Sequence, residues 1–195
     1  MPYFRAFGGM SMPILEYNAK KPTEDLMAAW QWLGFGVTTL LGTILHFLYD
    51  LLGGSFLIAP FSGVNESTFE HMKLLFWPML LFAGVQRLFF SERADFWCVK
   101  LRGICFGLLL IPVLFYTYNG VIGPSPDAVN IGIFFVCAAL AYRLEAHLFS
   151  QNNTYRTCRL SLLILLLLAL LFCVFTFHTP RLALFRDPLT GGYGI

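Results

Sequence analysis

The chain consists of long apolar stretches separated by short segments rich in charged, glycine and proline residues. A helix that crosses a membrane needs about 20 predominantly apolar residues, and five stretches come close to that length or exceed it. They are Ala28–Leu52, Phe69–Phe90, Trp97–Tyr118, Val129–Leu148 and Leu160–Phe177. This pattern predicts an all-α fold class, a polytopic transmembrane helix bundle with about five spans.

Composition supports a membrane location. Hydrophobic residues make up 57% of the chain and charged residues only 12%, with a mean hydropathy of +0.69, which is more apolar than a water-facing surface tolerates. We therefore expect a multi-pass protein of the cell membrane, in a bacterium the inner membrane, with membrane lipids as partners. The net charge of +2 gives no reason to expect a nucleic-acid partner.

The whole chain, residues 1–195, reads as a single membrane domain. Residues 1–27 mix charges with aromatic residues and lack the order of a cleavable signal, so we expect them to lie on the membrane surface. Residues 28–178 form the predicted bundle. The tail, residues 179–195, is rich in turn residues, which is usual for a disordered segment. The apolar residues among the turns offer the alternative of a segment folded back over the outer mouth of the bundle, and both interpretations stay open.

Basic residues predict the orientation, because short loops rich in Lys and Arg stay on the cytoplasmic side. Ten of the 13 basic residues precede the first span or flank the second and fourth turns between spans: Arg5, Lys20, Lys21, Arg87, Arg93, Lys100, Arg102, Arg143, Arg156 and Arg159. The N-terminus is then cytoplasmic and the C-terminus extracytoplasmic. We interpret the pair Glu145 and His147 as part of the cytoplasmic interfacial rim.

The segment from Phe61 to Lys73 places two carboxylates, an imidazole and an ammonium at the start of the second span. Ionisable groups at membrane depth are costly, and this makes the segment a candidate functional site. In the predicted orientation it meets the end of the first span, which carries His46 and Asp50, on the extracytoplasmic side.

His46 and Asp50 are four residues apart and share one helix face. Imidazole and carboxylate groups bind zinc, and three of them with one water leave an open catalytic position. We predict His46, Asp50 and His71 as metal ligands, with Glu70 as a further candidate and zinc or another divalent ion as cofactor. Glu70 and His71 point about 100° apart, so one of them acts as a general base; Ser67, Glu70 and His71 form the predicted catalytic set.

We expect the substrate to bind in a cavity between the first three spans. Its polar contacts would come from the ends of several helices on the extracytoplasmic side. The predicted substrate-binding residues are Asn65, Glu66, Lys73, Tyr116, Tyr118, Asn119 and Asp127.

A structural interpretation stands beside the functional one. Ser67 and Glu70 have the spacing of a capping box, and Asn65 can serve the preceding turn. The remaining groups can form ion pairs that lock the first two helices together, for example Asp50 with Lys73 and His46 with Glu66.

Two resemblances bear on function. The spacing Ser67-x-x-x-His71 resembles that of the alkaline ceramidase and adiponectin-receptor superfamily, which implies a zinc-dependent hydrolase. The chain lacks that superfamily's late His-x-x-x-His pair and has fewer helices. The run Val64-Asn-Glu-Ser-Thr-Phe-Glu-His71 and the ending from Leu184 to Gly194 resemble a family of small bacterial membrane proteins of unknown function, which implies no activity.

Three function classes remain open. The first is a membrane enzyme that hydrolyses a lipid-like substrate, or a binder of such a molecule, with the site facing the extracytoplasmic side. The second is a transporter or channel subunit that binds an ion or proton, which predicts a homo-oligomer. The third is a structural or accessory subunit. Because the ionisable cluster has no counterpart at the other end of the same helices, the sequence favours a site open to one face.

Overall fold

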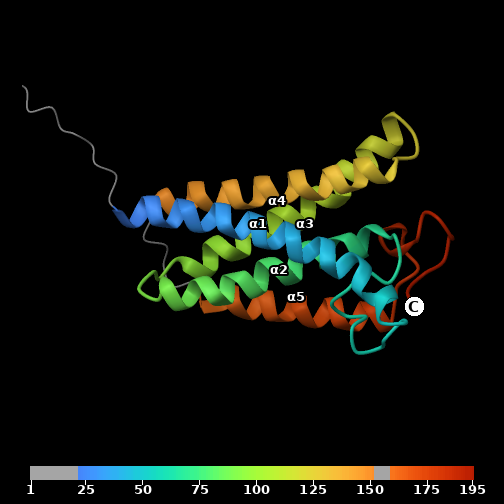
Figure 1. The fold of residues 1–195 in the computed structure, drawn as a ribbon, viewed down its shortest axis with the longest axis horizontal. Helices are drawn as coiled ribbons and strands as arrows, with labels where there is room; N and C mark the ends of the chain where they lie inside the picture. The colour runs from blue at the N-terminus through green and yellow to red at the C-terminus, as the bar shows by residue number, and fades with distance from the viewer. Residues whose placement is uncertain (1–21, 152–158) are drawn as a thin grey trace, which may run out of the picture.

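The computed structural model describes residues 22–151 and 159–195, which form a bundle of long helices (Figure 1). All five α-helices are long and apolar enough to cross a membrane, so this is a multi-pass membrane protein and the predicted all-α fold is confirmed. The described elements are α1 (Pro22–Leu51), α2 (Thr68–Phe89), α3 (Phe96–Val121), α4 (Asp127–Ser150), α5 (Arg159–Phe177) and a short 3-10 helix, η1 (Ala183–Phe185).

The predicted spans match α2 to α5 to within three residues at each end. Helix α1 is longer, since it begins at Pro22, six residues before the predicted start at Ala28. Proline suits the first position of a helix, because its missing N–H is not needed there. The predicted surface segment falls mostly on residues 1–21, which lie outside the described part of the chain.

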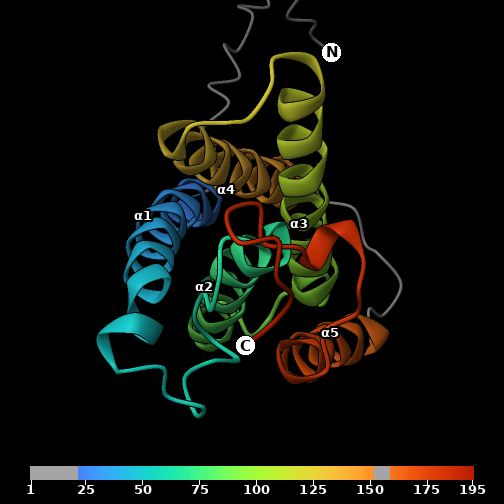
Figure 2. The same cartoon turned by 90° about the vertical axis from the view of Figure 1, so that its right-hand side faces the viewer.

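Helix α2 is the centre of the bundle. It contacts α1, α3, α4 and α5, which surround it in the view along the bundle (Figure 2). Its side chains Leu75, Phe76 and Met79 are fully buried. Helix α5, by contrast, exposes many of its leucines, as expected of a helix that faces lipid acyl chains. The buried side chains of α2 are therefore close to several other helices.

At one end of the bundle the tail packs against the loop between α1 and α2 (Figure 1). Phe185 of η1 is buried, and its ring centroid lies 4.5 Å from that of Phe69. Asn65 donates a hydrogen bond from Nδ2 to the carbonyl oxygen of Gly194, at 3.0 Å. Gly194 has a φ of +69° and lies against Thr179, so only glycine fits there. We name this end the loop end of the bundle.

The opposite end contains a buried ion pair between α3 and α4. Lys100 Nζ lies 2.5 Å from Glu145 Oε2, and both side chains are essentially inaccessible to solvent. The ammonium also faces the rings of Phe96, Tyr142 and Phe149, at 5.5 to 5.8 Å from their centroids. The interpretation of Glu145 as part of an interfacial rim is wrong, because Glu145 joins two helices inside the protein.

Candidate metal site

A hydroxyl group from the α1–α2 loop sets the position of His46. Ser62 is fully buried; its Oγ accepts a hydrogen bond from the amide of Tyr49, at 2.9 Å, and donates one to the carbonyl oxygen of Leu45. The amide of Gly63 donates to the same carbonyl. The loop thus inserts into the hydrogen-bond ladder of α1 at the turn that carries His46, a recognised cause of a local bend.

The start of α2 is fixed by its own side chains. Ser67 is the N-cap, and its Oγ accepts a hydrogen bond from the amide of Glu70, at 3.4 Å. Asn65 Oδ1 accepts one from the amide of Ser67, at 2.9 Å. The capping roles of Ser67 and Asn65 are confirmed. The Glu70 half of the predicted capping box is wrong, because the Glu70 carboxylate accepts the amide of Val64 and pairs with Lys73, and Asn65 takes the amide of Ser67 in its place. Between Asn65 and Ser67, Glu66 is held just before the helix, one turn from His71.

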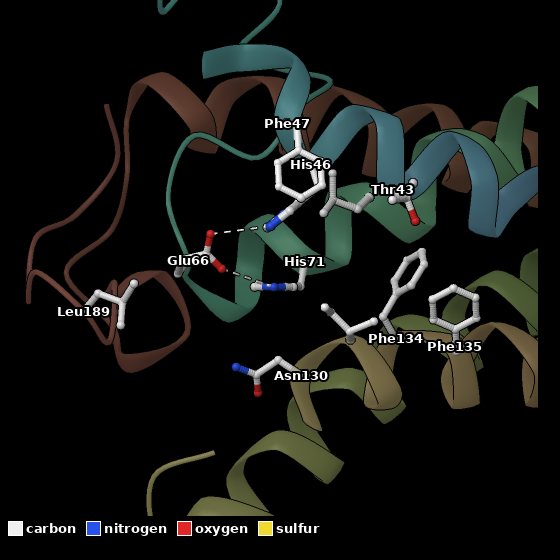
Figure 3. Close-up of a pocket in the computed structure, with 12 residues that line it drawn as sticks. Thr43, His46, Phe47, Glu66, His71, Asn130, Phe134, Phe135 and Leu189 are labelled. Atoms are coloured by element: carbon white, nitrogen blue, oxygen red, sulfur yellow. Dashed lines mark ion pairs between the residues drawn. The ribbon is translucent and has the colours of Figure 1, made fainter. Parts of the chain in front are cut away.

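The structure brings His46, Glu66 and His71 together (Figure 3). His46 Nε2 lies 3.6 Å from Glu66 Oε1, and His71 Nε2 lies 3.6 Å from Glu66 Oε2. The three ligand atoms lie within 4.8 Å of one another. The predicted contact of His46 with Glu66 is confirmed, and His71 joins it. The carboxylate of Glu66, 39% exposed, lies between two half-buried imidazoles.

The hydrogen bonding of His71 shows what this cluster requires. His71 Nδ1 lies 3.0 Å from the carbonyl oxygen of Ser67, which can only accept, so Nδ1 carries the proton. In the neutral ring Nε2 then presents a lone pair toward Glu66. Two acceptors that face each other at 3.6 Å repel unless a cation lies between them. The cation is either a proton on His71 or a metal ion.

The geometry fits a small divalent metal. Zinc binds histidine nitrogen and carboxylate oxygen at about 2.0–2.1 Å, so neighbouring ligand atoms in a tetrahedral site are about 3.4 Å apart. Each imidazole lies 3.6 Å from the carboxylate, close to this value, but the two imidazoles approach different oxygens of Glu66. The three ligand atoms lie within 4.8 Å of one another, so a metal bound to all three requires a small closing movement of the side chains. Ser67 would orient His71 from the far side of its ring, as the outer partners of metal-bound histidines do. Three protein ligands leave a fourth position free.

His46, Glu66 and His71 all line a cavity of about 380 Å³. The cavity lies between α1, α2 and α4, with Leu189 of the tail at its edge (Figure 3). The predicted location between the first three helices is wrong, because α4 rather than α3 packs next to α1 at this point. The lining residues are Gly42, Thr43, His46, Phe47, Glu66, His71, Leu74, Asn130, Ile131, Phe134, Phe135 and Leu189.

Other predicted ligand and catalytic residues lie outside this cavity. Asp50 is exposed one turn beyond His46 and is not in the group of ligand atoms. Glu70 pairs instead with Lys73, at 2.6 Å, and accepts the amide of Val64. Lys73 is fully buried, and it also donates to the carbonyl oxygen of Ala59 and to Thr176 of α5. The predicted pair of Asp50 with Lys73 is therefore replaced by a pair within α2.

The predicted substrate-binding residues of α3 are also not among the residues that line the cavity. Tyr116 and Tyr118 lie near the end of α3. Asn119 caps that end by donating to the carbonyl oxygen of Phe115 and accepting from the amide of Ser125. Asp127 begins α4, and its side chain lies outside the described part of the structure.

Two residues of the site were missed by the sequence assignments. Asn130 of α4 lines the cavity, and its Oδ1 accepts a hydrogen bond from Ser125 Oγ, at 2.7 Å. The sequence did offer a signal for Asn130, because it lies at the start of the fourth span, on the same predicted side of the membrane as His46 and His71. Ser62 had no such signal, because serine in a glycine-containing loop is common and its target in α1 is set only by folding.

Comparison with known proteins gives a family but no function. Neither the curated proteins nor the solved structures contain a match to this chain. A family model described as "Family of unknown function (DUF6512)" matches residues 19–195, which include every described helix and the tail. The chain therefore belongs to this family of unknown function.

Proposed function

We propose that this protein binds a divalent metal ion, zinc by preference, through His46, Glu66 and His71, and uses the metal to hydrolyse a lipid-like substrate. The observation that carries the proposal is the cluster itself: two histidines and one carboxylate with facing acceptors, next to a cavity with room for a substrate. Such a donor set suits zinc and leaves a position for water.

The chemistry follows from that open position. Zinc lowers the pKa of a bound water to about 7 and polarises a substrate carbonyl, so it would supply a hydroxide near neutral pH. Ser67 and Glu70 are occupied in the cap of α2 and in the pair with Lys73, and we assign neither of them a part in the reaction. Asn130 Nδ2 can donate a hydrogen bond to the polar part of a substrate, whereas Thr43 Oγ1 already donates to the carbonyl oxygen of Thr39 and can only accept one.

The proposal includes the orientation. The basic residues favour a cytoplasmic N-terminus, which puts the loop end of the bundle, and the cluster with it, at the extracytoplasmic face. The spacing of Ser67 and His71, which resembles that of a zinc-hydrolase superfamily, is compatible with this assignment for His71, whereas Ser67 caps the helix.

Elemental analysis by mass spectrometry tests the metal directly. The detergent-purified protein, prepared without chelators and supplied with zinc, is compared with His46→Ala, Glu66→Ala and His71→Ala. We expect near-stoichiometric metal in the wild type and loss in each variant. His178→Ala is the matched control, because His178 is exposed at the end of α5 and is not in the cluster.

Folded protein that holds no divalent metal would overturn the proposal, as would equal metal content in the wild type and His71→Ala. The second candidate function would then apply: a subunit that binds a proton between Glu66 and the two imidazoles, as part of a transport path. The same two 3.6 Å contacts support that candidate. A proton on Nε2 of each histidine would also remove the repulsion between the imidazole nitrogen and the Glu66 oxygen.

A further inference from the structure

The cavity extends from the cluster into the membrane-spanning part of the bundle. Gly42 lies nine residues before the end of α1, and Phe135 lies eight residues after the start of α4. At a rise of 1.5 Å per residue these positions are about 12–14 Å from the helix ends. The cluster of His46, Glu66 and His71 lies at the end of the cavity near the α1–α2 loop and Leu189. The apolar lining residues extend from there toward the middle of the helices.

The rim of the cavity is apolar and exposed. Phe47 of α1 is 62% exposed, and Ile131 and Phe135 of α4 are 56% and 39% exposed. These residues belong to helices that cross the membrane, and exposed apolar side chains within a span face acyl chains. The opening between α1 and α4 therefore faces the bilayer rather than only the water above it.

The size of the cavity favours a narrow occupant. A volume of about 380 Å³ is near the lower limit of ligand pockets, which range over about 300–1,000 Å³. The inner end is tightly packed: a Cβ added to Gly42 would lie 2.5 Å from Phe134 Cζ and 2.8 Å from the carbonyl oxygen of Leu74. One acyl chain fits such a space better than two.

Charge narrows the class of occupant further. Among the described residues that line the cavity there is no Lys or Arg, and Glu66 is the only carboxylate. A phosphate group would find no Lys or Arg among these residues, beside the metal, to neutralise its charge. A neutral ester or amide carbonyl needs none, since the metal and the amide of Asn130 can contact it.

We propose that the substrate is a single-chain amphiphile with an ester or amide linkage, whose acyl chain slides in from the bilayer between α1 and α4. This inference rests on the proposed hydrolase function. With the chain against Phe134 and Phe135, the carbonyl is at the cluster. Water adds its oxygen to the carbonyl carbon, the bond to the ester oxygen or amide nitrogen breaks, and the leaving group takes a proton from the water.

Photocrosslinking tests this proposal. The zinc-loaded protein in lipid nanodiscs is exposed to a long-chain fatty acid amide with a diazirine near its carbonyl end, and labelled residues are mapped by mass spectrometry. We expect labels on the cavity faces of α1 and α4, removed by excess unlabelled amide. Thr43→Trp should abolish them, because Thr43 lines the cavity and a tryptophan there fills it.

Ile44→Trp is the matched control. Ile44 is the next residue of α1, 48% exposed, and is not among the lining residues, so labelling should be unchanged. Zinc is measured in both variants and should equal that of the wild type. Labels that do not compete with unlabelled amide, or equal labelling in the two tryptophan variants, would overturn the proposal. Absence of zinc with intact, saturable labelling would overturn the hydrolase function alone.

Discussion

The two ends of the bundle both contain ionisable side chains, yet they differ in whether the charges are satisfied inside the protein. Lys100 and Glu145 form a closed pair at 2.5 Å among aromatic rings. His46, Glu66 and His71 form an open cluster beside a cavity, with acceptors that face one another. Ionisable groups within the bundle are therefore not equivalent. The buried pair neutralises its own charges, although Glu145 Oε1 has no hydrogen-bond partner among the described residues, whereas the cluster with facing acceptors is suited to bind a cation.

The largest effect is expected from breaking the closed pair. Lys100→Met leaves Glu145 buried without its partner, and removal of one member of a buried pair costs about 3–5 kcal/mol of unfolding free energy. Denaturant titration in detergent measures this. The double variant Lys100→Met/Glu145→Met should recover most of the stability, since it removes both charges. A double variant as unstable as the single one would show that the pair is not the cause.

The next effect comes from filling the open cluster. Zinc at about 100 times its dissociation constant should stabilise the protein by about 2.7 kcal/mol, and His71→Ala should abolish the gain. The stabilisation by zinc should decrease in acid, because protons compete with the metal for the imidazoles. Thermal unfolding with and without zinc, at neutral and at acidic pH, measures both effects. A gain that persists in His71→Ala would contradict the site.

A third test concerns the space around the closed pair. A Cβ on Gly103 would lie 2.3 Å from Glu145 Cγ, and because Lys100 holds that side chain, Gly103→Ala should destabilise the protein by about 1–3 kcal/mol. Gly84→Ala is the control, since nothing lies within 4 Å of its added Cβ, and it should leave stability unchanged or raise it by up to about 1 kcal/mol. Thermal unfolding of the two variants measures the difference. Equal changes in stability would contradict the close contact between Gly103 and Glu145.

The smallest effect on stability is expected at Ser62. Ser62→Ala removes the hydroxyl that bridges Tyr49 and Leu45, at a cost of about 1 kcal/mol. Because this bridge fixes the turn that carries His46, zinc affinity should fall by about tenfold, as measured by competition with a chelating dye. Ser55→Ala, in the same loop, is the control. An unchanged zinc affinity would show that the Ser62 hydrogen bonds do not position His46 for metal binding.

Much of the fold follows from the sequence because local composition specifies it. Leu160–Phe177 is almost entirely apolar and forms α5 within one residue of the prediction. The cap at Ser67 is also local, since it needs only a hydroxyl at the right distance from the first amides of α2. The start of α1 was misplaced because its first turn is polar, and a search for apolar residues passes over it.

The site was predictable in part. The proximity of His46 and Glu66 follows from a short connection between adjacent helices, and it is seen in the structure. The partner of Lys73 was not predictable, because both Glu70 on the same helix and Asp50 at the end of the preceding helix were available carboxylates. Only the structure shows that the pair forms within α2. The wall of the cavity was not predictable either, because the order of helices around α2 depends on long-range packing.

The sequence by itself determined that the protein is a helical membrane protein with its ionisable groups concentrated at the start of the second span, because apolar length and charge are local properties. Only the tertiary structure decided which of these groups are satisfied. It pairs Glu70 with Lys73 and leaves Glu66 between two histidines, and it places α4 across from them to form the cavity. That choice depends on contacts between residues far apart in the chain, which spacing does not specify.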